Sequence, residues 1–180
     1  MVFLRHFTQY VSSYDEFLAL YDPADLANQP QALVGAIANK NVQLRVAITQ
    51  RLLDDGANAA YQEGSVNVLH GLFDRIDKHN VQLEAPMAKR LIELGADVNL
   101  YSKRTPTPFV LMLKNDKLPG EEAAPFYDIF LDRPELDLTL PIEYGASRTI
   151  RQGLEYMGAH TRPLLGEKLR LRDTKFGELR

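Results

Sequence analysis

The chain has 180 residues, of which 45% are apolar and 25% are charged, and its formal net charge is −3. This composition is ordinary for a folded globular protein, and the absence of cysteine excludes disulfides, thiolate metal sites and cysteine nucleophiles. The acidic balance disfavours nucleic acid as a partner, because phosphate neutralisation needs a basic surface.

Neither a membrane span nor a secretion signal is expected. No apolar run approaches the roughly 18 residues that a spanning helix needs. Near the N-terminus, Arg5, His6 and Gln9 interrupt the apolar residues, so the apolar core of a signal peptide is missing. Together with the lack of cysteine, these features predict a cytoplasmic location.

The first predicted element is a helical cap over residues 1–22. Ser13 and Glu16 have the spacing of a capping box, in which the serine hydroxyl accepts from the amide three residues on and the glutamate reaches back. The helix should end before Pro23, because proline disfavours helical geometry at the preceding residue. Such a cap covers the open apolar side of a neighbouring helical unit.

An internal repeat follows the cap. Residues 41–57 read NVQLRVAITQRLLDDGA, and residues 80–96 read NVQLEAPMAKRLIELGA, with eight of the seventeen positions identical and no gap. A period of 20–50 residues is typical of stacked helical units. The offset between the two copies therefore divides the chain into four predicted units, over residues 24–56, 57–95, 96–134 and 135–160.

Each unit is predicted to hold two helices. In the first unit they lie on either side of a break at residues 39–41. In the second unit the first helix covers 67–78, and the second begins near Ala85 and Pro86, because proline is tolerated in a first helical turn. Leu52 and Leu91 are expected to be equivalent core residues at the ends of the second helices.

The third and fourth units are less regular. Thr107 and Pro108 give the third unit a helix start, with threonine as N-cap and proline at the first helical position. A second helix is expected from Pro125. The fourth unit is degraded, and we expect Ser147 to open a helix that serves as a C-terminal cap.

The last segment, residues 162–180, is predicted to be a basic C-terminal tail. It holds six Lys or Arg against three Asp or Glu, so the rest of the chain has a charge of −6. The simplest interpretation is a solvated tail. From Gly166 onward Leu169 and Leu171 alternate with basic residues, which leaves a short strand, a docked helix and disorder as alternatives.

Three pieces of the chain resemble the ankyrin repeat: residues 52–58, residues 91–99 (LIELGADVN) and residues 107–109 (TPF). The resemblance covers about residues 24–156, although ankyrin units usually repeat every ~33 residues. It implies an all-α, ankyrin-like solenoid of about four helix pairs with helical caps at both ends. The residues that it marks as structural are Leu52, Gly56, Leu91, Gly95, Asp97, Asn99, Thr107 and Pro108.

The turn residues of this motif have a physical reason of their own. Gly56 and Gly95 follow the second helix of a unit, where glycine adopts positive φ at little cost. Asp97 and Asn99 can bond the local backbone in the turn that comes next. These residues should therefore set the boundary between one unit and the next.

No motif for catalysis or cofactor binding is present. The four histidines have no metal-ligand spacing, no glycine-rich phosphate loop precedes a Lys-Ser or Lys-Thr pair, and no nucleophile elbow occurs. His70 lies where the resemblance implies a structural histidine. We therefore expect no enzyme activity, no cofactor and no metal site.

The turns between units are the predicted binding surface. One tyrosine recurs in each of three successive turns, and tyrosine and arginine are enriched at binding hot spots. The alternative is that Tyr61 and Tyr101 pack over their own loops. The residues expected to bind a partner are Tyr61, Gln62, Glu63, Tyr101, Lys103, Arg104 and Tyr144.

These features predict a non-catalytic module that binds another protein. A single small domain of this kind would act by occluding or holding its partner. One version is an inhibitor, such as an immunity protein whose acidic body faces a basic site on a toxin or enzyme. An adaptor or chaperone for a secreted effector is the alternative, and an enzyme on a helical-repeat scaffold is a third, less supported class. No membrane contact is expected.

Overall fold

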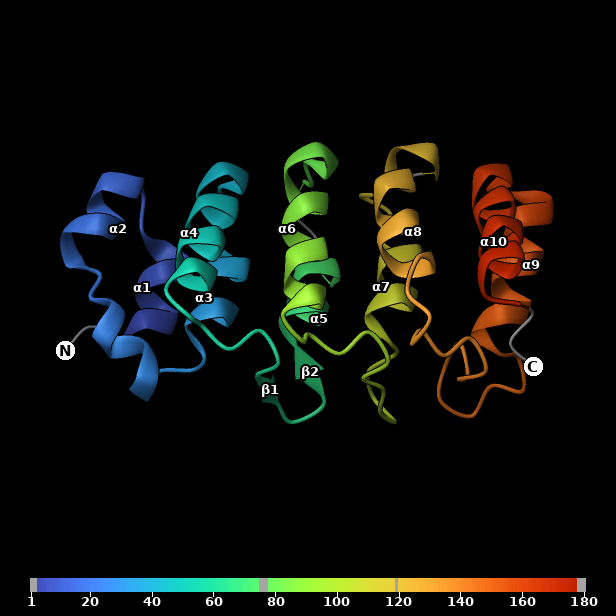
Figure 1. Ribbon diagram of the computed structural model, residues 1–180, viewed down its shortest axis with the longest axis horizontal. Helices are drawn as coiled ribbons and strands as arrows, with labels where there is room; N and C mark the ends of the chain where they lie inside the picture. Colours follow the sequence, from blue (N-terminus) through green and yellow to red (C-terminus); the bar gives the residue numbers. More distant parts are fainter. Residues whose placement is uncertain (1–2, 75–77, 119, 178–180) are drawn as a thin grey trace.

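The computed structural model describes residues 3–74, 78–118 and 120–177 of the chain (Figure 1). This part of the protein is mostly helical, which confirms the all-α class. Its one sheet is a two-stranded hairpin of β1 (Gln62–Glu63) and β2 (Val66–Asn67). Within the described ranges, no helix combines the length and the apolar character needed to cross a membrane.

The helices stand side by side along the long axis of the molecule in two rows (Figure 1). In one row α3 packs against α1 and α5, and α5 packs against α7; in the other, α4 packs against α2 and α6, and α6 packs against α8. The first row contains α1 (Leu4–Tyr10), α3 (Ala32–Ala38), α5 (Val68–Phe73) and α7 (Pro108–Lys114). The second contains α2 (Tyr14–Leu20), α4 (Val42–Asp54), α6 (Val81–Glu93) and α8 (Ala124–Leu131).

Two further helices lie at the C-terminal end, and short 3-10 segments join the rows. Helix α10 (Pro163–Phe176) packs against α9 (Ile150–His160) and against α8. The 3-10 segments are η1 (Pro23–Asn28) and η2 (Gly120–Ala123). The hairpin, the α6–α7 loop and the α8–α9 loop all extend beyond the same ends of the helices (Figure 1).

The same turn occurs three times at the period found in the sequence. The side-chain oxygens of Asn58, Asp97 and Asp137 each accept a hydrogen bond from the amide two residues on, at 3.0, 2.8 and 2.8 Å. This is the Asx turn that short polar side chains favour. The three turns follow one another at nearly the spacing that separates Asn41 from Asn80, so this turn recurs at the period of the sequence repeat.

The ends of α4 and α6 also match. Gly56 and Gly95 have φ of 92° and 104°, as predicted, and the amide after each glycine donates to the carbonyl of Leu52 or Leu91, at 2.9 and 3.0 Å. Bonds of this kind satisfy carbonyls that a helix end leaves free. Both leucines are fully buried, which confirms the expectation for the core.

Asparagine closes two helices of the first row in the same way. The Asn39 side chain, after α3, donates to the carbonyls of Thr8 and Val11 at 3.0 and 3.2 Å. The Asn115 side chain, after α7, donates to the carbonyl of Phe73 at 2.9 Å. In both cases the amide ties the end of one helix to the end of the preceding helix in its row.

Two helices differ from their predicted limits. Helix α6 begins at Val81 rather than near Ala85, because Asn80 caps it by accepting from the Leu83 amide at 3.3 Å. Pro86 therefore lies inside the helix, on its exposed side. Helix α5 ends at Phe73, short of the predicted limit at residue 78; residues 75–77 of that prediction lie outside the described residues.

Two predicted helix starts are also corrected. Ser13 does cap α2, accepting from the Glu16 amide at 3.1 Å, but the Glu16 carboxylate bonds the amide and hydroxyl of Ser12 instead of reaching back to Ser13. Helix α9 begins two residues later than Ser147 would place it. Thr149 forms the full capping box there with Gln152.

The C-terminal segment is a docked helix and not a solvated tail, so the structure selects one of the three alternatives. Leu165 and Leu169 are buried in α10, whereas Leu171 remains exposed. The buried Arg172 guanidinium donates to the carbonyls of Leu131 and Leu136, both at 2.9 Å. This explains the basic character in part, because one of the basic side chains closes the end of α8 instead of facing water. Residues 178–180 of the predicted tail lie outside the described residues.

Candidate functional site

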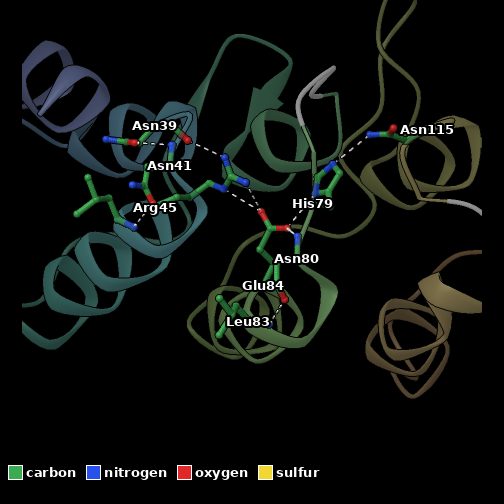
Figure 2. A network of polar contacts seen from close by, with 9 residues as sticks. Asn39, Asn41, Arg45, His79, Asn80, Leu83, Glu84 and Asn115 are labelled. Atoms are coloured by element: carbon green, nitrogen blue, oxygen red, sulfur yellow. Dashed lines mark hydrogen bonds and ion pairs between the residues drawn. The ribbon is translucent and has the colours of Figure 1, made fainter. Parts of the chain in front are cut away.

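A buried network of charged and polar side chains joins α4 to α6 (Figure 2). The side chains of Arg45 and Glu84 are both 0% exposed, and the Arg45 Nε donates to Glu84 Oε1 at 2.8 Å. Arg45 Nη1 donates to the Asn39 carbonyl at 2.6 Å. On the other side of Glu84, its Oε2 lies 3.0 Å from His79 Nδ1 and accepts from the Asn80 amide at 2.8 Å.

The electrostatics of this network keep Glu84 ionised. Burial by itself raises the pKa of Glu84, but the hydrogen bond to His79 and the positive charge of Arg45 outweigh it, so the pKa lies below its ordinary value. Both carboxylate oxygens are occupied, and neither partner reaches solvent. A buried, fully bonded carboxylate of this kind links helices and has no access to a substrate, so the network is not a catalytic site.

Sequence reasoning missed this network, although the repeat contains the pattern that could have revealed it. Arg45 and Glu84 occupy the same position in the two copies of the repeat. Equivalent positions of stacked units face each other, so opposite charges at a buried register position predict an ion pair between neighbours. Considered alone, each residue indicates only a charged position within a helix and predicts no ion pair.

A surface hollow on the loop side of the molecule is the better candidate for function. It has a volume of 370 Å³ and lies between α1, α3, the hairpin, α5, the α6–α7 loop and α7. Its apolar lining includes Val34, Val66 and Leu111. Its charged lining consists of Arg5, Glu63, Asp74 and Arg104.

His70 supports the wall of this hollow. The Asn67 amide donates to His70 Nδ1 at 3.2 Å, and His70 Nε2 lies 3.1 Å from the Pro106 carbonyl, which must accept. The neutral tautomer with its proton on Nε2 satisfies both bonds. Burial lowers the pKa of His70 below its ordinary value, so the ring is held neutral. His70 thus has the structural role that the sequence predicts, tying α5 to the loop before α7.

The rim of the hollow carries both signs of charge. Arg5 Nη1 donates to both carboxylate oxygens of Glu63, at 3.0 and 2.8 Å, so these two charges offset each other. Arg104 is exposed, and among the described residues it takes part in no ion pair. The hollow therefore combines an apolar floor with a guanidinium at its edge that has no ion-pair partner among the described residues.

The structure brings some predicted binding residues together and separates others. Glu63 and Arg104 line the same hollow. Lys103 lies over the ring of Tyr144, with its Nζ 5.5 Å from the ring centroid, and Tyr144 is 57% exposed. Gln62 is exposed in strand β1, outside the lining of the hollow.

Tyr61 and Tyr101 differ from the exposed tyrosine face that the spacing suggested. Both are only half-buried rather than exposed. The loop that holds Tyr101 is closed on itself, because Ser102 and Thr105 exchange backbone hydrogen bonds at 2.9 and 3.4 Å. Their partial burial agrees better with the alternative in which these two tyrosines are not free binding residues, whereas Tyr144 has an accessible ring on this side.

The residues expected to be structural connect neighbouring turns. The Asn99 side chain donates to the Glu135 carbonyl at 2.6 Å and accepts from the Asp137 amide at 2.8 Å. The Asp97 carbonyl accepts from the Asn67 side chain at 2.7 Å. Thr107 caps α7, with Pro108 at the first helical position. These bonds hold the loops that border the hollow.

Two other kinds of site find less support in the geometry. A larger hollow of 460 Å³ lies between the α1–α2 and α3–α4 turns, but Lys40 is the only charged residue that the described part of the chain contributes to its lining. Within the described residues, no group of three or more His, Asp or Glu side chains is placed to hold a metal ion.

Comparison with known proteins adds no relative. No family model, no curated protein and no solved structure matches this chain. The function must therefore be argued from the geometry of the hollow and its loops.

Proposed function

We propose that the chain is an ankyrin-like solenoid of about four helix pairs with helical caps. Three kinds of contact recur at the period of the sequence repeat: the Asx turns, the glycine helix ends and the asparagine N-caps of α4 and α6. Repeats of this kind bury a continuous core only by stacking. Packing of each helix against the next in its row supports the same interpretation.

We further propose that this solenoid binds another protein through the loop side. The observation that carries the proposal is the 370 Å³ hollow, to which six separate segments contribute. An apolar floor with charged residues at the edge matches the usual anatomy of an interface, in which an apolar centre is surrounded by a polar rim. The neighbouring loops, with Tyr144 and Lys103, extend that surface.

The simplest mode of action is occlusion of a partner site, as in an inhibitor or immunity protein. A rigid surface binds with a low entropic cost because few groups are ordered on association. An adaptor or chaperone role would use the same surface. The absence of cysteine supports a reducing compartment such as the cytoplasm.

Site-specific photocrosslinking tests the binding surface. Val66, which is 39% exposed in the hollow, and Leu171, which is 56% exposed on α10, are each replaced by benzoylphenylalanine in the full chain. We expect a discrete protein adduct from position 66 and none from position 171. Equal adducts at both positions, or adducts only from α10, would contradict the proposal.

A further inference from the structure

On the loop side, some basic residues are held in ion pairs and others are not. Arg5 is paired with Glu63, and Lys114 with Glu143. In contrast, Lys103, Arg104 and Arg148, here called the loop cations, form no ion pair within the part of the chain that the structure describes. Within the described residues these three cations are therefore not offset by ion pairs, although the chain as a whole has a charge of −3.

Two of the loop cations rest on aromatic rings, which position them. Lys103 Nζ lies 5.5 Å from the centroid of Tyr144, and Arg148 Cζ lies 5.3 Å from the centroid of Tyr156. The rings are 57% and 53% exposed. A cation–π contact of this kind orients a cation without neutralising it. Each charge remains available to a partner.

The backbone holds the rings and cations in one strip. Ile142 donates its amide to the Arg148 carbonyl at 3.0 Å, so the α8–α9 loop that carries Tyr144 is closed beside Arg148. Lys103 bridges from the α6–α7 loop to this ring, and Arg104, next in the chain, lines the hollow. The strip therefore leads directly into the apolar hollow.

We propose that this surface recognises an acidic protein segment, with an apolar side chain seated in the hollow and neighbouring Asp or Glu carboxylates on the loop cations. Arginine suits this role because its planar guanidinium binds a carboxylate in bidentate fashion. The inference rests on the proposed protein-binding function and deepens it. The proposed partner site is therefore acidic, whereas the net charge of the chain suggests a basic one.

A protein segment fits the hollow better than a nucleic acid does. Tight phosphate binding needs many cations, typically six to ten contacts, whereas the strip offers three. The apolar floor of Val34, Val66 and Leu111 matches a buried side chain.

The test begins with a phage-displayed library of random linear peptides, selected against the full chain. We expect selected peptides to place Asp or Glu next to a large apolar residue. One of them, labelled with a fluorophore, is then titrated against wild type and Arg104→Glu, with binding followed by anisotropy. Charge reversal should weaken binding about tenfold or more, as for close charge pairs at interfaces. A peptide with Lys in place of its acidic residues should bind Arg104→Glu better than wild type.

Arg170→Glu is the matched control. Arg170 is an exposed arginine of α10 with no ion pair among the residues described, and its reversal makes the same change in net charge. We expect it to leave binding within about twofold of wild type, since exposed charges farther apart than ~8 Å are largely screened at physiological salt. Equal losses in the two variants would overturn the inference, because the effect would then follow net charge.

A second variant separates this inference from the proposed function. Gly71 lines the hollow and is exposed, so Gly71→Met fills the hollow without changing charge. Peptides that lose binding with Gly71→Met but not with Arg104→Glu would overturn the acidic-segment inference and leave protein binding at this surface intact. If no peptide is selected, or if neither variant changes binding, both proposals fail.

A labelled single-stranded oligonucleotide is titrated in parallel. Binding that Arg104→Glu abolishes, in the absence of any selected peptide, would assign the loop cations to nucleic acid and overturn the inference. Thermal unfolding of each variant, followed by circular dichroism, checks that the fold is unchanged.

Discussion

Two neighbouring junctions between helix pairs are built from opposite chemistry. Between α4 and α6 lies the buried ion pair of Arg45 with Glu84. Between α5 and α8, aromatic rings fill the space: Phe73 contacts Phe126 edge-on with centroids 5.0 Å apart, and it meets Phe130 at 5.6 Å. Both junctions are fully buried.

The two junctions differ at one equivalent position of the sequence repeat, which is charged in one and apolar in the other. At the position that corresponds to Glu84 in the next unit the chain has Ala123, which is also fully buried, so the charge is confined to the first junction. A buried ion pair adds little net stability, because desolvation offsets its attraction. It does, however, penalise any register in which the two charges fail to meet. The aromatic junction contributes apolar burial and tolerates small shifts.

The largest expected effect comes from breaking the charged junction on one side. Glu84→Gln leaves Arg45 buried without a countercharge, so the free energy of unfolding should fall by about 3–5 kcal/mol. The double variant Arg45→Met with Glu84→Met should recover most of that loss, because apolar replacements of a buried pair are often neutral or stabilising. Urea denaturation of the two variants is the measurement. Additive losses in the double variant would show that the two residues do not act as a pair.

A core leucine near both junctions should cost somewhat less. Leu91→Ala removes a fully buried side chain from α6 and should lower the free energy of unfolding by about 2–5 kcal/mol. Leu52→Ala is the matched variant in α4, and we expect it to be the milder of the two. A loss below about half a kcal/mol at Leu91 would contradict the stacked arrangement.

A smaller effect on stability is expected at the glycines that end α4 and α6. Gly95→Ala and Gly56→Ala both place a side chain at positive φ, which should cost about 1 kcal/mol. A Cβ at Gly95 would lie 3.4 Å from Ala60 Cβ, whereas one at Gly56 meets nothing within 4 Å. The Gly95 variant should therefore be the less stable in a thermal melt. A reversed order would show that strain and not packing separates the two turns.

The smallest effect concerns pH. Burial holds the pKa of His70 below its ordinary value of 6.5, so just below that value the unfolded chain binds more protons than the folded chain. Stability should then decrease as pH falls through 6.5 towards the folded pKa. His70→Gln should flatten this part of the profile. Stability is measured against pH for both proteins, since the other histidines contribute equally to each. Parallel profiles would count against a neutral, buried His70.

The repeat made much of the fold predictable, because identical residues at the helix ends impose identical local geometry. Gly56 and Gly95 fixed the ends of α4 and α6, and Thr107 fixed the start of α7. Pro86 was misleading, since a proline can follow a strong asparagine cap by several residues if its ring faces solvent. The docking of α10 was not readable, because Leu169 and Arg172 find their partners only in the tertiary fold.

The candidate site was predictable only in part. Glu63, Lys103, Arg104 and Tyr144 were selected from turn position and residue type, and they do lie on the loop side. The floor of the hollow was missed, because Val66 and Leu111 come from different units and nothing local marks them. Tyr101 was expected to be exposed, yet it is partly buried beside a loop that bonds to itself.

The charged junction also bears on the order in which the chain folds. Repeat arrays can nucleate in any unit and grow outward, since each unit contacts only its neighbours. Here neither α4 nor α6 can complete its burial alone, because Arg45 or Glu84 would be desolvated without its countercharge. If the chain is the solenoid proposed above, the α3–α4 and α5–α6 pairs should therefore form in a single kinetic step, and growth should proceed from that joined pair towards α8 and α10.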